Sequence, residues 1–177
     1  SGWLMDFSLP QAYLIGLLVI LGSAAVLVAR QLLRVRRDEA ALMRLENSSK
    51  NGAQTAADLY ELASVQLRKR LYGQAIDTLK LATKSASAEP AEAQALIENA
   101  LGFALAAQNN YGAAIKHYRA ALRAKADYPV ALNNLAYALE KQQKPEEAKE
   151  QYLKVLELDS SNGTARKRLK RLERTAA

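Results

Sequence analysis

The sequence predicts an all-α protein in which one membrane-spanning helix precedes a solenoid of three helix–turn–helix repeats and a C-terminal capping helix. Three observations predict this fold class. Alanine and leucine dominate the 177 residues, and there are only eight glycines and four prolines, a composition typical of helical proteins. An uncharged apolar segment occupies residues 12–29. One spacing of large and small apolar residues recurs farther along the chain.

The chain lacks the residue sets that support catalysis or metal binding. It has no cysteine, which excludes disulfides, thiolate metal sites and cysteine nucleophiles. It has no glycine-rich phosphate loop, and its single histidine, His117, has no partners in the sequence that would complete a metal site or a catalytic triad. We therefore expect no enzyme activity, no catalytic residue, no metal and no cofactor, and we interpret His117 as a surface or packing residue.

The net charge of +7 is unevenly distributed. Residues 30–50 carry six basic and three acidic groups, and residues 163–177 carry six basic groups against one acidic group. Residues 51–162 are balanced, with thirteen of each. Nucleic-acid binding is not expected, because it would more often place a basic stripe over the folded body.

Residues 1–11 form an N-terminal tail, and residues 12–29 are predicted to cross a lipid bilayer. At about 1.5 Å per residue this segment would be about 27 Å long, close to the roughly 30 Å of a hydrocarbon core. The alternative is a cleaved signal peptide. A signal peptide favours basic residues before its apolar segment, and the first eleven residues contain no lysine or arginine.

The arginines that follow the span predict its orientation. Cytoplasmic flanks of membrane spans are enriched in Lys and Arg, so the C-terminal part is expected in the cytoplasm or its organellar equivalent. The flanking residues are Arg30, Arg34, Arg36 and Arg37.

Residues 30–52 are predicted to form a basic juxtamembrane helix and a linker. The helical pattern continues to about Glu46, as a stalk or as an amphipathic helix on the membrane surface. The segment NSSKNG, residues 47–52, predicts a break before the next domain.

An internal repeat occupies most of the remaining chain. A shift of 34 residues places one set of apolar residues on another: Leu135, Ala136, Ala148 and Tyr152 on Leu101, Gly102, Ala114 and Tyr118. A further copy, Leu62, Ala63, Ala75 and Leu79, is offset by 39 residues. The five additional residues fit within residues 85–94, where Pro90 predicts a loop.

This pattern resembles the tetratricopeptide repeat, with three copies over residues 56–89, 95–128 and 129–162, together residues 56–162. The resemblance implies an α-solenoid in which small residues sit where paired helices approach most closely. A larger side chain there would overpack the contact at about 1–3 kcal/mol. Tyr72 and Tyr111 stand at the turn, where the family often has tyrosine, and Pro145 replaces them in the third copy. The prolines that usually close such repeats are absent.

Residues 163–177 are predicted to form a basic capping helix, because the last repeat of a solenoid needs a polar outer face. Leu169 and Leu172 are expected to face the repeats. The basic residues are expected to face water: Arg166, Lys167, Arg168, Lys170 and Arg171. The alternative is a basic surface for anionic lipid or an acidic partner.

The resemblance also implies a partner-binding groove lined by the first helix of each repeat. Its predicted residues are Tyr60, Ser64, Leu67, Leu96, Asn99, Phe103, Val130, Asn133 and Tyr137, accompanied by Ala57, Ala106 and Glu140. Apolar anchors beside asparagines suit an extended or helical protein segment. They do not match the Lys and Arg with which some family members bind acidic chaperone tails. The alternative is that the aromatic residues pack between helices.

The order of these parts resembles the single-span tetratricopeptide factors for photosystem I assembly of cyanobacteria and plastids. The segments that carry the likeness are YLIGLLVILGSAAVLVARQLLRVRR, ALNNLAYALEKQ and ARKRLKRLE. The resemblance implies a thylakoid protein with its repeats on the cytoplasmic or stromal side, which binds photosystem I subunits or assembly intermediates. The alternative is an accessory repeat protein of bacterial envelope biogenesis or protein translocation, in the bacterial inner membrane.

Overall fold

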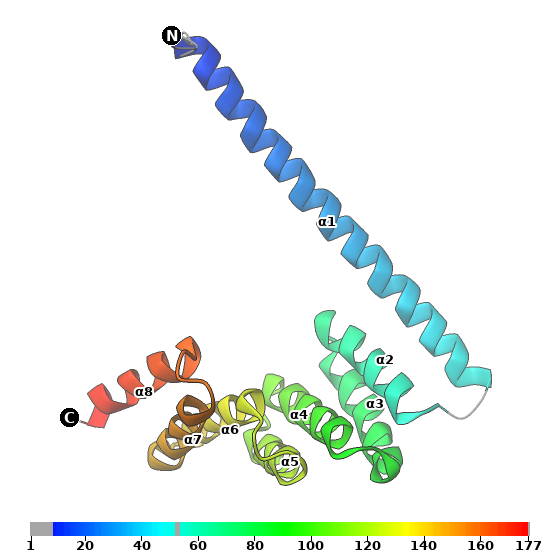
Figure 1. The fold of residues 1–177 in the computed structure, drawn as a ribbon. Coiled ribbons are helices and arrows are strands. Elements are labelled where there is room, and N and C mark those ends of the chain that lie inside the picture. The colour runs from blue at the N-terminus through cyan, green and yellow to red at the C-terminus, as the bar shows by residue number, and fades with distance from the viewer. Residues whose placement is uncertain (1–8, 52–53, 177) are drawn as a thin grey trace. The chain divides into compact units, whose positions relative to one another are not determined.

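The structure, a computed structural model, describes residues 9–51 and 54–176 and is all-helical over them, with eight α-helices, one short 3-10 helix and no strand (Figure 1). This confirms the predicted fold class. The chain divides into two compact units, residues 1–44 and residues 45–177.

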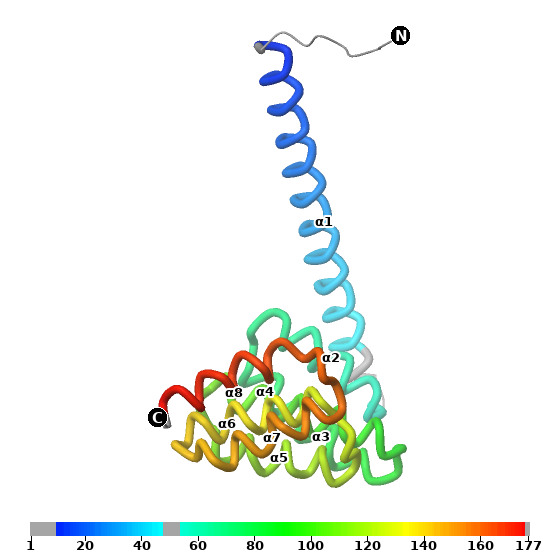
Figure 2. The backbone as a smooth tube through the Cα atoms, turned by 60° about the vertical axis from the view of Figure 1, so that its left-hand side comes forward, coloured from blue at the N-terminus to red at the C-terminus, as the bar shows by residue number. Residues whose placement is uncertain are grey.

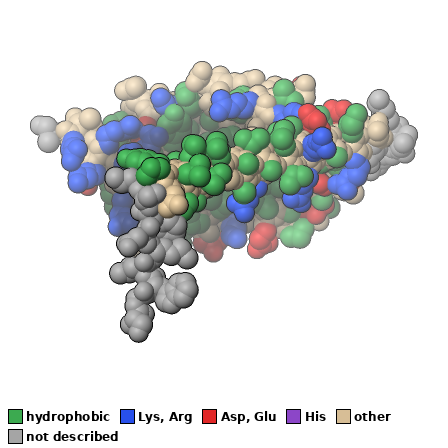
Figure 3. Space-filling view, turned by 90° about the horizontal axis from the view of Figure 1, so that it is seen from above, with side chains coloured by type: hydrophobic (Ala, Val, Ile, Leu, Met, Phe, Trp, Pro, Cys, Tyr) green, Lys and Arg blue, Asp and Glu red, His purple; other side chains and the backbone are tan. Residues whose placement is uncertain are grey.

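The first unit contains most of α1 (Leu9–Asn51), a helix of 43 residues. Residues 10–47 contain an 18-residue window with a mean hydropathy of 2.5, and no part of that window is buried. Hydrophobic side chains accordingly dominate the visible face of this helix in the view from above (Figure 3). By length and composition, α1 is the one helix among the described residues that could cross a membrane.

The predicted break at residues 47–52 is wrong in position, because α1 continues without interruption to Asn51. The Asn and Ser residues of this segment are weak helix formers, but they do not stop a helix as proline does. The predicted membrane-spanning segment and the residues that follow it up to Asn51 therefore belong to one continuous helix.

The second unit consists of three helix pairs and a final helix. The first helices of the pairs lie in one layer and the second helices in another (Figure 2). Each pair packs on the next through contacts of α3 with α4 and of α5 with α6. The pairs are α2 (Ala56–Arg68) with α3 (Tyr72–Ser85), α4 (Ala91–Ala107) with α5 (Tyr111–Ala124), and α6 (Pro129–Lys141) with α7 (Pro145–Leu158), followed by α8 (Gly163–Ala176).

The first helix of the second repeat begins before the predicted start of the repeat. Helix α4 starts at Ala91, whereas the repeat was predicted to start at residue 95. Pro90 is the N-cap, and its carbonyl accepts the first helical hydrogen bond from Gln94 N at 3.1 Å. Most of the five additional residues between the first and second repeats therefore extend α4. Only residues 86–90, including the 3-10 helix at Ala86–Ala88, connect α3 to α4.

The turn inside each repeat has the same backbone geometry. Arg70, Asn109 and Gln143 adopt positive φ angles of 59°, 62° and 60°. The following amide closes the turn by donating to a carbonyl five residues earlier, as Lys144 N does to Leu139 O at 3.0 Å. This is the Schellman arrangement, which satisfies carbonyls at the end of a helix.

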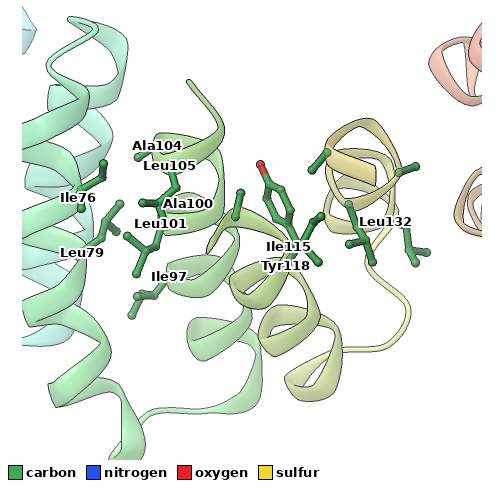
Figure 4. Close-up of a cluster of buried hydrophobic side chains, with 14 of the residues drawn as sticks. Ile76, Leu79, Ile97, Ala100, Leu101, Ala104, Leu105, Ile115, Tyr118 and Leu132 are labelled. Atoms are coloured by element: carbon green, nitrogen blue, oxygen red, sulfur yellow. The ribbon is translucent and has the colours of Figure 1, made fainter. Parts of the chain in front are cut away.

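The core uses the small residues as the repeat pattern predicts. Ala75, Ala114 and Ala148 are completely buried. Gly102 of α4 faces Tyr118 of α5 so closely that an added Cβ would lie 2.7 Å from two ring carbons. Around this contact, aliphatic side chains from neighbouring helices fill the interior (Figure 4).

Helix α8 covers the end of the solenoid. Ala165 and Leu172 are buried, and Leu169 packs partly against the core. The apolar face of this helix therefore points toward the repeats, as predicted for Leu169 and Leu172.

Candidate functional site

The nine predicted groove residues lie on the three first helices. Tyr60, Ser64 and Leu67 come from α2; Leu96, Asn99 and Phe103 from α4; Val130, Asn133 and Tyr137 from α6. Contacts of α4 with both α2 and α6 bring the three sets together on adjacent helices.

Three of these residues present apolar surface to solvent. The exposed fractions of Leu96, Phe103 and Val130 are 41%, 45% and 53%. Leu96 also lines a pocket of about 150 Å³ between α2 and α4, together with Tyr60 and Ala93. The pocket has the size and the apolar lining to accept one side chain of a bound segment.

Tyr60, Leu67 and Ser64 are less available. Tyr60 and Leu67 are half-buried and pack against the core, as the alternative interpretation of the aromatic residues predicts for Tyr60. The Ser64 hydroxyl donates to Tyr60 O at 2.8 Å, within its own helix. The α2 part of the predicted groove therefore contributes packing surface more than free polar groups.

The asparagines form a hydrogen-bonded ladder between repeats. Asn99 Nδ2 donates to Tyr128 Oη at 3.4 Å, and Asn99 Oδ1 accepts from Asn134 Nδ2 at 3.0 Å. One repeat farther on, Asn133 Nδ2 donates to Asn162 Oδ1 at 3.3 Å. The ladder fixes the orientation of the amides before any partner binds.

The ladder leaves one acceptor unused. Among the described side chains, Asn133 Oδ1 is buried and has no hydrogen-bond donor. A buried acceptor without a donor costs about 1–3 kcal/mol, so this end of the ladder is less stable than the end at Asn99.

Tyr137 is covered by its neighbours. Its ring makes an edge contact with Tyr111 at a centroid distance of 6.3 Å. Arg168 of α8 lies over the same ring, with Cζ 4.6 Å from the centroid, a cation–π geometry. Tyr137 therefore holds α8 in place, and the C-terminal end of the predicted groove is occupied by this helix.

Glu140 is the centre of this contact. Its side chain is 8% exposed, and it pairs with Arg168 at 3.6 Å and with Arg171. Its Oε1 also accepts a hydrogen bond from Tyr152 Oη at 2.6 Å. Arg171 is exposed, as predicted, but the prediction for Arg168 is wrong because its side chain is mostly buried beside Glu140. The carboxylate attracts both guanidinium groups.

Burial changes the ionisation of two tyrosines near the groove. Burial, with the Glu140 carboxylate next in importance, raises the pKa of Tyr152 well above its ordinary value. Burial and the nearby Tyr60 raise the pKa of Tyr128, and the hydrogen bond with Asn99 partly opposes this. Both hydroxyls are neutral at physiological pH and can serve as donors.

Sequence reasoning missed the partners that complete these clusters: Tyr128, Asn134, Asn162, Arg168 and Arg171. A signal existed for the last two. Arg168 and Arg171 are three residues apart and share one face of a helix, and Glu140 is the one acidic residue among the predicted groove positions. Tyr128 and Asn162 lie just before or between helices, where the repeat pattern gives no indication of side-chain direction.

The other predicted positions have simpler surroundings. Arg30, Arg34, Arg36 and Arg37 are exposed on α1 directly after its apolar part. His117 Nδ1 lies 2.7 Å from Glu98 Oε2, at hydrogen-bond distance across the α4–α5 pair, and thus has a packing role. Within residues 9–51 and 54–176, no three His, Asp or Glu side chains are grouped as metal ligands.

Comparison with known proteins identifies the repeats. Tetratricopeptide-repeat models match residues 99–128 and 129–162. An uncharacterized protein named ycf37 from Guillardia theta is 30% identical over 93% of each chain. Its counterpart from Cyanophora paradoxa is 29% identical over 96% of this chain and 98% of that protein. The chloroplastic tetratricopeptide repeat protein PYG7 of Arabidopsis thaliana is 30% identical over 94% of this chain but 55% of its own length.

Solved structures share the fold. MamA has a TM-score of 0.74 and 18% identity, over 81% of each chain. The first repeat domain of Spaghetti (RPAP3), bound to an HSP90 peptide, has a TM-score of 0.64 and 23% identity, over 71% of this chain and 95% of that one. These similarities support the solenoid and carry no information on the partner.

Proposed function

Because this chain belongs to the ycf37 family of tetratricopeptide-repeat proteins, we propose that it is a membrane-anchored scaffold that holds photosystem I subunits or partial complexes during assembly. Tetratricopeptide-repeat proteins are protein-binding scaffolds and not enzymes, which agrees with the expectation drawn from the residue content. The photosystem I partner is supported by the resemblance of the span, the repeats and the basic C-terminus to assembly factors.

We place the protein in the thylakoid membrane, with its repeats on the cytoplasmic or stromal side. A chloroplastic relative and the apolar α1 support a plastid-type membrane protein. The four arginines after the apolar segment support the side, since cytoplasmic flanks are enriched in Arg and Lys.

The observation that carries the binding proposal is the combination of exposed apolar side chains with preoriented amides on the first helices. Leu96 and Phe103 offer apolar contact area, and the pocket beside Leu96 accepts an anchor side chain. Asn99 and Asn133 are held in place by the ladder. An apolar protein segment with free backbone amides matches both features.

The test is recovery of partners by the full chain in mild detergent from a photosynthetic membrane extract. The groove variant is Leu96→Ser with Phe103→Ser. The matched control is Leu81→Ser with Leu153→Ser, because these leucines are 52% and 49% exposed on the second helices α3 and α7. Both variants remove exposed apolar side chains and leave the core intact.

We expect photosystem I subunits to be recovered by the wild type and the control, and at least about tenfold less by the groove variant, as for truncation of central anchor residues. Equal recovery by all three would exclude the groove as the binding surface. Recovery of other membrane proteins without photosystem I subunits would contradict the assembly role and leave the scaffold intact.

A further inference from the structure

Helix α8 presents a concentrated cationic surface that the groove does not use. It carries six basic residues and one acidic residue, Glu173. On its inner side Ala165 and Leu172 are buried and Leu169 is half-buried, so Lys and Arg predominate among its exposed side chains (Figure 3). The helix is therefore an electrostatic surface and not an amphipathic helix free to insert its apolar face into lipid.

Part of this charge is not paired with an acidic side chain among the described residues. Arg168 and Arg171 are paired with Glu140. Within the part of the chain that the structure describes, no acidic side chain pairs with Lys167, Lys170 or Arg174. These three side chains surround one hollow of about 660 Å³, together with the hydroxyl-bearing Thr164 and the two paired arginines.

We propose that this surface, defined by Lys167, Lys170 and Arg174, docks on the anionic lipid headgroups of the bilayer in which the chain is anchored. Lys and Arg donors beside a hydroxyl complement phosphate or sulfonate oxygens. A bilayer is favoured over a soluble acidic partner because a chain tethered to a membrane by α1 keeps that surface at high effective concentration. The inference rests on the proposed membrane anchoring and is independent of what the groove binds.

The expected strength follows from the number of free charges. Each Lys or Arg near an anionic membrane strengthens binding about fivefold at physiological ionic strength, so three contribute about 100-fold. This attraction falls off within a Debye length and weakens with added salt. Groove binding through apolar anchors has no such dependence, because residues 51–162 carry balanced charge.

The experiment uses the full chain in phospholipid nanodiscs of phosphatidylcholine, with or without phosphatidylglycerol. Since the chain has no cysteine, a single Thr175→Cys substitution places a donor dye at the exposed end of α8. Energy transfer to an acceptor on the lipid headgroups reports how often α8 lies at the bilayer surface. Carbonate extraction, done separately, reports whether the chain is integral to the membrane.

The test variant is Lys167→Gln with Lys170→Gln and Arg174→Gln, which leaves the arginines that pair with Glu140. The control is Lys80→Gln with Lys84→Gln and Lys116→Gln, three exposed lysines on α3 and α5. Both change the net charge by the same amount. Circular dichroism and trypsin sensitivity establish that α8 is folded in each.

We expect phosphatidylglycerol to raise the energy transfer for the wild type and the control, and high salt to abolish this increase. In the α8 variant, the ratio of chains with α8 docked on the bilayer to chains with α8 undocked should fall about 100-fold. No effect of phosphatidylglycerol, or an equal loss in the control, would overturn the proposal. Binding of an acidic peptide to α8 without any effect of phosphatidylglycerol would also overturn it and assign the surface to a protein. Release by carbonate would contradict the anchor, while docking would still be measurable on the discs.

Discussion

Replacing Gly102 with alanine should destabilise the repeat unit, although alanine is the better helix former. The added Cβ would lie 2.7 Å from Cδ1 and Cε1 of Tyr118 and 3.2 Å from the carbonyl oxygen of Ala114. Carbon atoms prefer separations of about 3.5–4.0 Å. Tyr118 is 2% exposed and cannot move without displacing the core.

The change in the free energy of unfolding is the cost of overpacking minus the gain in helix propensity. Overpacking of this kind costs about 1–3 kcal/mol, and the change from glycine to alanine within a helix returns up to about 1 kcal/mol. We therefore expect the free energy of unfolding to fall by about 0.5–2 kcal/mol. In the third repeat Ala136 and Tyr152 occupy the same positions, but there the tyrosine hydroxyl is held by Glu140. In the second repeat Ala106 takes the position of Glu140, so the hydroxyl of Tyr118 has no carboxylate partner there.

The assay is urea unfolding of the full chain in mild detergent, followed by far-ultraviolet circular dichroism. The rescue variant is Gly102→Ala with Tyr118→Leu, because the first repeat pairs Ala63 with Leu79 at these positions and both are fully buried. The two changes together should cost at least about 1 kcal/mol less than the sum of the single changes, as expected for residues in contact.

The control is Gly73→Ala on α3. An added Cβ there would meet only Gln108 Nε2, at an ordinary 3.7 Å, so this substitution should stabilise the protein by up to about 1 kcal/mol. If Gly102→Ala stabilised the protein to the same extent, or if Tyr118→Leu showed no coupling to it, the packing argument would be refuted.

Three further predictions concern the second unit. Glu140→Ala should lower the free energy of unfolding by about 1–3 kcal/mol, because Arg168 and Tyr152 lose their acceptor. Trypsin should then cleave α8 faster, and an unchanged cleavage rate would contradict this. Burial raises the pKa values of Tyr118 and Tyr152 above the ordinary value of 10.0. The contribution of the two neutral hydroxyls to the stability of the fold is therefore complete below about pH 10 and is lost as the pH rises beyond it. An absorbance titration should show both tyrosines ionising only as the chain unfolds. Gln143→Gly should raise the unfolding midpoint, because glycine adopts φ 60° without a Cβ clash, whereas Gln143→Val should lower it.

The solenoid could be predicted from the sequence because its contacts are local and periodic. Ala114, Gly102 and Tyr118 recur at a fixed interval as Ala148, Ala136 and Tyr152, and each repeat packs mainly on the next. Periodicity specifies the core of each helix more strongly than its ends. That is why the end of α1 at Asn51 was misplaced and the extension of α4 back to Ala91 was not foreseen, since neither depends on a core position.

The candidate site was predictable only in part. Its backbone positions followed from the repeat, and all nine lie on first helices. Which side chains are free depended on contacts outside the repeat pattern. The cover over Tyr137 comes from Arg168, in a helix that has no counterpart in the repeats. Long side chains such as arginine reach partners that the spacing of apolar residues does not reveal.

The apolar seating of α8 has a consequence for self-association. Its own Ala165 and Leu172 are buried against the repeats, and Tyr152 of the preceding helix is fully buried. A chain shortened to end before Gly163 would leave the repeat surface on which these two side chains pack as an open edge. We expect such chains to associate head to tail into oligomers. The 14-residue helix α8 therefore prevents the solenoid of one chain from being continued by the next.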